Sequence, residues 1–228
     1  MLLQMEPGVQ QNADGALNTA RAGKTGEGMV SWLHGRFYEN CYRNNLFSIS
    51  SKLTALSAAT ATATSLGSGA QPIVGVWNPI NSPVNIVLLQ SAMRDAINTA
   101  TSVAPGDFVW AVSTGNYAPL TAGTSPFNRK ALNNNGSQAM AFTLSGGQVL
   151  TGLTNNLVII EPNAEINTAS ALLTTSIAAA TPVPSAAAVQ NFDGSWIIPP
   201  GGVLALMNTL STITHSVAAR LLWAEIPL

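Results

Sequence analysis

Residues 75–93 read GVWNPINSPVNIVLLQSAM, two apolar runs on either side of the polar segment NPINSP. The side chain of Asn78 can start a turn, and Pro79 presets φ for the next turn position. Pro83 lacks the N–H group that a central strand uses, which places it at the first residue or the edge of a strand. The segment therefore predicts a β-hairpin with one strand before the turn and one after it.

The strand after this turn is apolar without a clean alternation. Ile86 and Leu88 face one way, while Val84, Val87 and Leu89 do not separate from them by polarity. An antiparallel sheet usually has one face in water. We therefore expect a second sheet on one side of this strand and a neighbouring molecule on the other.

Short β-branched or aromatic runs follow residue 46 and alternate with Gly, Pro and Asn at the spacing of a sandwich or barrel. The predicted fold is all-β, an antiparallel, jelly-roll-like β-sandwich over residues 51–228. The pair Asn135-Gly136 favours a type I′ hairpin turn. The candidate strands are 46–51, 54–64, 71–78, 84–93, 107–113, 138–144, 148–151, 157–161, 166–176, 194–198, 202–208 and 214–226.

Residues 1–50 are predicted to form an extended, partly helical N-terminal arm. The first 28 or so residues are rich in Gly, Asn and Gln and contain no aromatic side chain, which is typical of a segment that orders on a partner. Val30, Leu33, Phe37 and Cys41 then follow a helical spacing and predict a short helix.

Charged residues make up 8% of the chain and leave a net charge of −1, against roughly 25% charged residues in ordinary soluble proteins. No broad basic field is available for nucleic acid. Ala, Thr, Ser, Asn and Gly replace the missing charges, and a neighbour can cover them without stranding a charge. The composition therefore favours permanent interfaces.

Several functional classes have no support in the sequence. Cys41 is the single cysteine, so the chain forms no internal disulfide and no cysteine zinc site, and a reducing compartment of synthesis is expected. No apolar run reaches the roughly 18 residues that span a membrane. We expect neither a membrane nor a nucleic-acid partner.

We also expect no enzymatic activity, cofactor or metal. His34 and His215 are far apart and belong to no metal-binding pair. Glu161 and Glu165 flank a turn and are candidates for paired carboxylates, or for a cation site with Asn163. A solvated loop explains them more simply. The Gly-rich stretches SLGSGA at 65–70 and PPGGV at 199–203 lack the lysine and the helix start of a phosphate loop.

The aromatic group Trp32, Phe37, Tyr38, Tyr42 and Phe47 has two interpretations, a small core between arm and sandwich or anchors for a neighbouring subunit. Buried aromatic and Arg side chains dominate the energetics of interfaces. The predicted partner-interface residues are Arg21, Lys24, Trp32, Arg36, Phe37, Tyr38, Tyr42 and Arg43.

Three stretches together resemble virion proteins of tailed bacteriophages, of the jelly-roll type used as capsid decoration, cement or head-fibre subunits. They are LHGRFYENCYRNNLFS at 33–48, WNPINSPVNIVLL at 77–89 and the end of the chain from IIPPGGVLALMN to VAARLLWAEIPL at 197–228.

This resemblance implies a structural protein without catalytic residues. It also implies a trimer on the outer surface of a virion capsid, made in the host cytoplasm, whose N-terminal arm reaches the major capsid protein or a neighbouring copy. We expect a decoration or cement protein that bridges capsomers. The alternative is a receptor-binding, tail-fibre or collar module whose loop 124–137 contacts host glycans.

Overall fold

The computed structural model describes residues 5–6, 20–21, 36–55, 71–97, 107–115, 125–134, 136–143, 157–163, 167, 185–209 and 215–228. The chain divides into two compact units, Met1–Glu39 and Asn40–Leu228. In the first unit, β1 (Met5–Glu6) and β2 (Ala20–Arg21) form a parallel pair.

The regular secondary structure described in the second unit is almost entirely β-strand. Residues 36–42 contain the short helix α1, Tyr38–Tyr42. The strands are β3 (Leu46–Ser50), β4 (Thr54–Ala55), β5 (Gln71–Trp77), β6 (Val84–Ile97), β7 (Phe108–Ser113), β8 (Phe127–Asn128), β9 (Met140–Thr143), β10 (Val158–Pro162), β11 (Ser185–Ile198), β12 (Val203–Asn208) and β13 (His215–Pro227).

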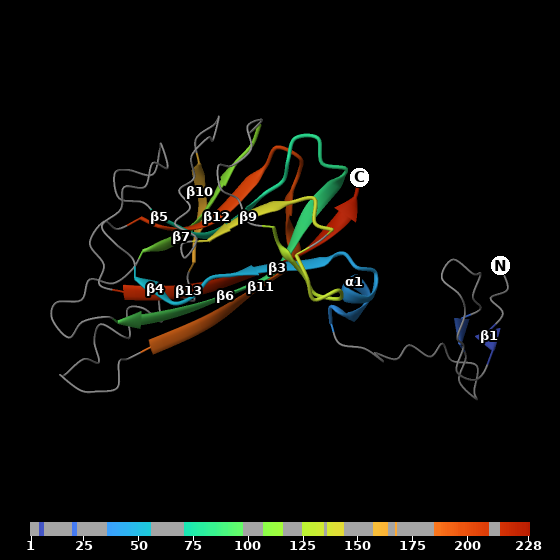
Figure 1. Cartoon of the computed structure of the whole chain (residues 1–228), viewed down its shortest axis with the longest axis horizontal. Coiled ribbons are helices and arrows are strands. Elements are labelled where there is room, and N and C mark those ends of the chain that lie inside the picture. Colours follow the sequence, from blue (N-terminus) through green and yellow to red (C-terminus); the bar gives the residue numbers. More distant parts are fainter. Residues whose placement is uncertain are drawn as a thin grey trace. The chain divides into compact units, whose positions relative to one another are not determined.

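These strands form two antiparallel sheets that lie one above the other (Figure 1). The five-stranded sheet has the order β10-β7-β12-β5-β9, and the six-stranded sheet has the order β11-β6-β13-β3-β8, with β4 also paired to β13. The last strand, β13, lies between β3 and β6, and β12 lies between β5 and β7. Late strands inserted between early ones in both sheets produce the double Greek key of a jelly roll. The predicted fold class is confirmed.

The predicted hairpin at NPINSP is wrong, although both of its strands exist. β5 belongs to the five-stranded sheet and β6 to the six-stranded sheet, so the segment is a corner between layers. The Asn78 side-chain NH₂ donates hydrogen bonds to the carbonyls of Val84 (2.9 Å) and Ile198 (3.0 Å). The turn residues specify a reversal of the chain, but long-range pairing decides which sheet receives the next strand.

The same asparagine holds a second corner, PPGG at 199–202, against the first. The Asn78 N–H donates to the Gly202 carbonyl (2.9 Å), and the Gly201 N–H donates to the Asn78 carbonyl (2.7 Å). Gly201 has a φ of 80°, and a Cβ at Gly202 would lie 2.7 Å from Ile198 Cγ2. Gly201 is therefore required by its backbone conformation, and Gly202 is required by close packing.

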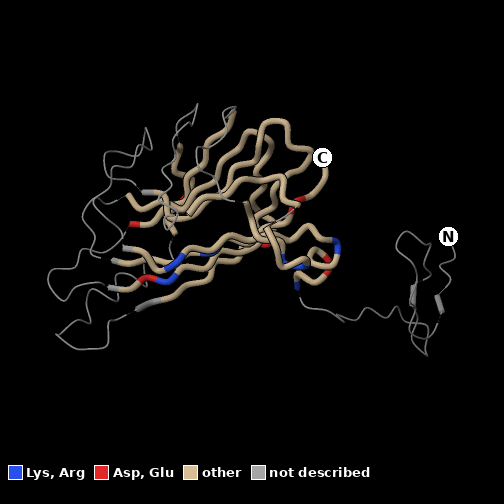
Figure 2. Tube along the Cα trace, viewed as in Figure 1, with Lys and Arg blue, Asp and Glu red and all other residues tan. Residues whose placement is uncertain are grey.

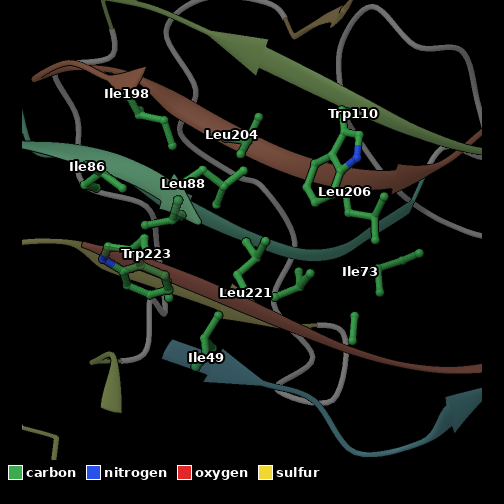
Figure 3. Close-up of a cluster of buried hydrophobic side chains, with 14 of the residues drawn as sticks. Ile49, Ile73, Ile86, Leu88, Trp110, Ile198, Leu204, Leu206, Leu221 and Trp223 are labelled. Atoms are coloured by element: carbon green, nitrogen blue, oxygen red, sulfur yellow. The ribbon is translucent and has the colours of Figure 1, made fainter. Parts of the chain in front are cut away.

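The core lies between the two sheets, and Figure 3 shows side chains from both layers pointing into it. Trp110 from β7 and Trp223 from β13 are fully buried there. Burying a large apolar side chain contributes about 1.5–3 kcal/mol. Phe47, which the sequence placed in the aromatic arm group, is 2% exposed and belongs to this core. Its strand β3 pairs with β13, so residues 46–50 are part of the sandwich.

Apolar side chains are also buried on the outward face of the five-stranded sheet. Its second apolar cluster consists of Trp77, Val109, Ala111, Phe142, Leu157, Val203, Ala205 and Met207. Phe142 is paired with Gly75, and a Cβ on that glycine would lie 2.0 Å from the Phe142 ring. The missing side chain therefore makes room for the ring on the sheet surface.

Other predictions have mixed outcomes. The strands on either side of Asn135-Gly136 belong to different sheets, so the predicted hairpin there is wrong. β11 begins at Ser185 instead of residue 194, because alanine-rich sequence gives little strand signal. Predicted strand 148–151, and most of 54–64 and of 166–176, lie outside the described residues.

Candidate functional site

The most distinctive surface of the sandwich is the side where both sheets end, at β10 and β11. Among the described strands, each of these two has a pairing partner on one side only. The Gln190 side-chain NH₂ in β11 donates to Glu161 Oε1 in β10 (3.2 Å). The two edges are therefore adjacent.

Large apolar side chains are exposed along this double edge. They are Val158 (62% exposed), Ile159 (46%) and Ile160 (45%) on β10 and Val189 (53%) and Ile197 (58%) on β11. Soluble proteins usually protect exposed edges with lysine or other charged side chains, with proline, or with β-bulges. β11 spans 14 residues and has a single charged residue, Asp193. This double edge is suited to being covered by another protein.

β11 is held firmly in place from inside the sandwich. The Trp110 indole N–H donates to Gln190 Oε1 (2.8 Å). The Trp110 ring also makes edge-to-face contacts with Phe192 (5.4 Å between centroids) and Trp196 (5.8 Å). Such aromatic pairs stabilise by about 0.5–1.5 kcal/mol beyond burial. The edge is therefore a preformed surface.

The outward face of β6 departs in part from the prediction. Ile86 and Leu88 point into the core as expected, and Val87 points outward and is half-buried. A Cβ at Gly194 would lie 3.2 Å from Val87 Cγ1, so the bulge of β11 itself covers part of this face. Leu89 lies at a register shift in β6 and is 7% exposed, which explains the irregular alternation.

Polar side chains cross this outward face from β13 to β11. The Arg220 guanidinium donates to Gln90 Oε1, and the Gln90 NH₂ donates to Asn191 Oδ1 (2.9 Å). Arg94 on β6 is exposed on the same face, because its neighbour Met93 points into the core. The sequence gave no sign of this network, because Arg220 is distant in the chain from Gln90 and from Asn191.

The predicted arm residues are divided between the two compact units. Arg21 lies in β2 opposite Glu6, and the Arg36 guanidinium lies over the Phe37 ring (5.2 Å). Tyr38 and Tyr42 are the first and last residues of α1, and both are exposed, as is Arg43. Lys24 and Trp32 lie outside the described residues. Binding of a partner by these residues remains a prediction.

The end of α1 is attached to the exposed loop after β8. Asn44 has a φ of 67° and, with Asn45, donates backbone hydrogen bonds to Cys41 and Asn40, as in a Schellman cap. The Asn128 NH₂ donates to the Asn44 carbonyl (3.2 Å). Lys130 Nζ donates to the Tyr42 carbonyl (2.6 Å) and lies 4.8 Å from the centre of its ring.

The described residues contain no group of three or more His, Cys, Asp or Glu side chains that is able to hold a metal. Glu161 is hydrogen-bonded to Gln190, and Glu165 lies outside the described part of the chain. In that described part, no helix is long and apolar enough to cross a membrane.

Neither a protein-family model nor a curated protein matches the chain. Among solved structures, it is weakly similar to a chain of the structure titled "KBV activated particle at acidic pH", with 11% identity over 100% of this chain and 89% of that chain. The TM-score is 0.23, too low to establish a common fold. The jelly-roll assignment therefore rests on the strand order.

Proposed function

We propose that the chain is a structural subunit of a virus particle, of the decoration or cement type. The observation that carries this proposal is the double edge, where five Val and Ile side chains are exposed and Asp193 is the exposed charged residue among the described ones. Jelly rolls occur in viral capsid proteins, in lectins and in cupins, so the fold alone does not select a function. The low charge content and the resemblance to bacteriophage virion proteins favour the first of these.

The proposed mechanism is mechanical. The subunit associates with copies of itself, as a trimer, and with the major capsid protein on the capsid surface. Burial of apolar area stabilises an interface by about 25 cal/mol per Å² before association costs are subtracted. Even if each interface buries a modest area, many interfaces over the shell together oppose its bursting, because each contact between capsomers has to break first.

The copy number of the protein in purified particles tests this role. Hundreds of copies support decoration, and a dozen or fewer contradict it and indicate a collar or tail. The purified protein is also expected to be an oligomer that binds expanded, empty capsids. A monomer without affinity for them contradicts the proposal.

Two variants locate the contact. Val189→Lys and Ile197→Lys place a charge on the exposed edge, where the folding stability should change by no more than about 0.5 kcal/mol. Both are expected to reduce self-association or capsid binding. Leu132→Lys is the matched control, because Leu132 is 71% exposed but lies in the loop after β8.

The arm is tested by removing residues 1–39. This cut keeps the hydrogen bonds that Asn44 and Asn45 accept from Asn128 and Glu225. The sandwich is therefore expected to fold, while its occupancy on the particle falls. Unchanged occupancy contradicts a role for the arm.

A receptor-binding module is the second candidate function. Residues 129–134 are all exposed, and the Asn128 Oδ1 accepts hydrogen bonds from the backbone N–H groups of Lys130 and Ala131 (3.0 and 2.9 Å). This turn displays its side chains on a fixed backbone. Glycan-array binding that is lost when residues 129–134 are replaced supports this function.

A further inference from the structure

Two arginines lie side by side on the outward face of the six-stranded sheet. Arg94 on β6 is paired with Ala218, and Arg220 on β13 is paired with Ala92, so the arginines occupy diagonal positions on adjacent strands. Diagonal neighbours in a sheet are about 7–8 Å apart, and like charges at such positions repel. An anion bound beside both would relieve this repulsion.

A chain of hydrogen bonds runs from Arg220 through Gln90 to Asn191, and the group that it leaves free at the surface is a donor. A guanidinium has no acceptor, so Gln90 turns its oxygen to Arg220 and its NH₂ to Asn191. The oxygen of Asn191 receives this bond, and its NH₂ is the group left at the exposed edge. The Arg220 Nε–H is buried and has no partner, so it does not add to the donors that a ligand on this face reaches. The network therefore suits a ligand rich in acceptors.

The exposed cations of the sandwich gather on one layer. In the described part of Asn40–Leu228, the exposed cations all belong to the six-stranded sheet or its connections. Figure 2 marks the Lys and Arg positions along the backbone in blue. They are Arg43, Lys52, Arg94, Arg129 and Lys130. The strands of the five-stranded sheet contain no Lys or Arg.

In the described part of Asn40–Leu228, most carboxylate side chains are buried or half-buried. Asp95 and Glu225 are buried, and Glu161 and Asp107 are half-buried and hydrogen-bonded to Gln190 and Thr209. The exposed carboxylate among these described residues is Asp193, in the bulge of β11. A second copy of the sandwich therefore offers little negative charge to this face.

We propose that Gln90, Arg94, Asn191 and Arg220, here called the donor face, bind carboxylates on an acidic surface of a different protein. That this protein is the viral shell rests on the function proposed above. Val189 and Ile197 are exposed beside the donor face, and a folded protein surface can cover them, whereas a chain of phosphates cannot. This favours an acidic protein over nucleic acid.

Binding of the full-length protein to fluorescent poly-L-glutamate, followed by anisotropy, tests this proposal. Arg94→Gln and Arg220→Gln are each expected to weaken binding at least about tenfold, because each removes a charge-assisted hydrogen bond. Arg94→Lys is expected to retain most of the affinity. Binding of the parent protein should fall as sodium chloride rises from about 0.05 to about 0.5 M.

Arg129→Gln is the matched control, since it removes the same charge from an exposed position in the loop after β8. It should leave poly-L-glutamate binding within about twofold, because it lies outside the donor face and contributes only screened attraction. An equal loss in Arg129→Gln and Arg94→Gln contradicts a specific face, as does a parent protein that does not bind. Circular dichroism confirms that each variant is folded. Tighter, equally arginine-dependent binding of oligodeoxythymidylate overturns the choice of carboxylate.

Empty shells separate this inference from the proposed function. If shells bind the parent protein and Arg94→Gln equally well, the donor face is wrong and the structural role stands. If shells bind neither while poly-L-glutamate binding needs the two arginines, the structural role fails and the donor face stands.

Discussion

Asn78, at the end of β5, donates a side-chain hydrogen bond to the carbonyl of Ile198, at the end of β11, although 120 residues separate them in the chain. The residue is fully buried, and its second side-chain bond reaches Val84. One asparagine thus holds together two of the corners at which the chain crosses between the sheets, the one after β5 and the one after β11.

Asn78→Ala is expected to lower the free energy of unfolding by about 1–3 kcal/mol, because the buried Ile198 carbonyl and the part-buried Val84 carbonyl lose this donor. Asn78→Asp should cost more, since a carboxylate cannot donate to those carbonyls and adds a buried charge. Urea denaturation measures both. Asn134→Ala, at an exposed position, is the control. A loss below about 0.5 kcal/mol in Asn78→Ala contradicts a stabilising role for the Asn78 side-chain hydrogen bonds.

Gly75→Ala tests the close packing of the outer apolar cluster. The added Cβ would lie 2.0 Å from Phe142 Cζ and 2.5 Å from the Leu204 carbonyl oxygen. We expect a loss of about 1–3 kcal/mol or more, as in other overpacked sites. Phe142→Leu should restore part of it, whereas the contact with the backbone carbonyl remains. If Gly75→Ala is as stable as the parent protein in urea, the packing is not as described.

Glu225→Gln tests the carboxylate that holds residues 137–139. Glu225 is 5% exposed and accepts hydrogen bonds from Ser137 Oγ (2.5 Å), the Gln138 N–H (2.9 Å) and the Trp223 indole N–H (3.3 Å). An amide has one acceptor oxygen, so at least one donor loses its partner. We expect a loss of about 1–3 kcal/mol and faster amide exchange at Gln138, measured by hydrogen-exchange mass spectrometry. Unchanged exchange there contradicts this role.

The sequence predicted most strands of the sandwich because β-branched and aromatic runs bury a continuous core, as Ile73, Leu204 and Trp223 do. It did not predict that NPINSP joins different sheets, because the turn residues are the same for a hairpin and a corner. The first half of β11 was missed for another reason. Alanines 186–188 have low strand propensity, and they form a strand because they pair with β6.

The candidate site was harder to predict from sequence. The aromatic and basic residues of the arm were visible as a composition shift, and their partner remains a prediction. The donor face depends on the register that sets Gln90 beside Asn191 and Arg94 diagonal to Arg220. No local pattern encodes that register, since Arg94 and Arg220 are distant in sequence.

The last prediction concerns the bond that holds β11 to the five-stranded sheet. Trp110→Phe keeps an aromatic ring, although a smaller one, and removes the N–H donor to Gln190. Gln190→Leu removes the acceptor and leaves the buried indole N–H unpaired. Each variant is expected to lose about 1–3 kcal/mol in urea denaturation. A double-mutant cycle should give a coupling of about 1 kcal/mol. Gln138→Leu, whose exposed side chain lies elsewhere, is the control. Additive losses in the cycle would show that Trp110 holds the edge by ring packing alone.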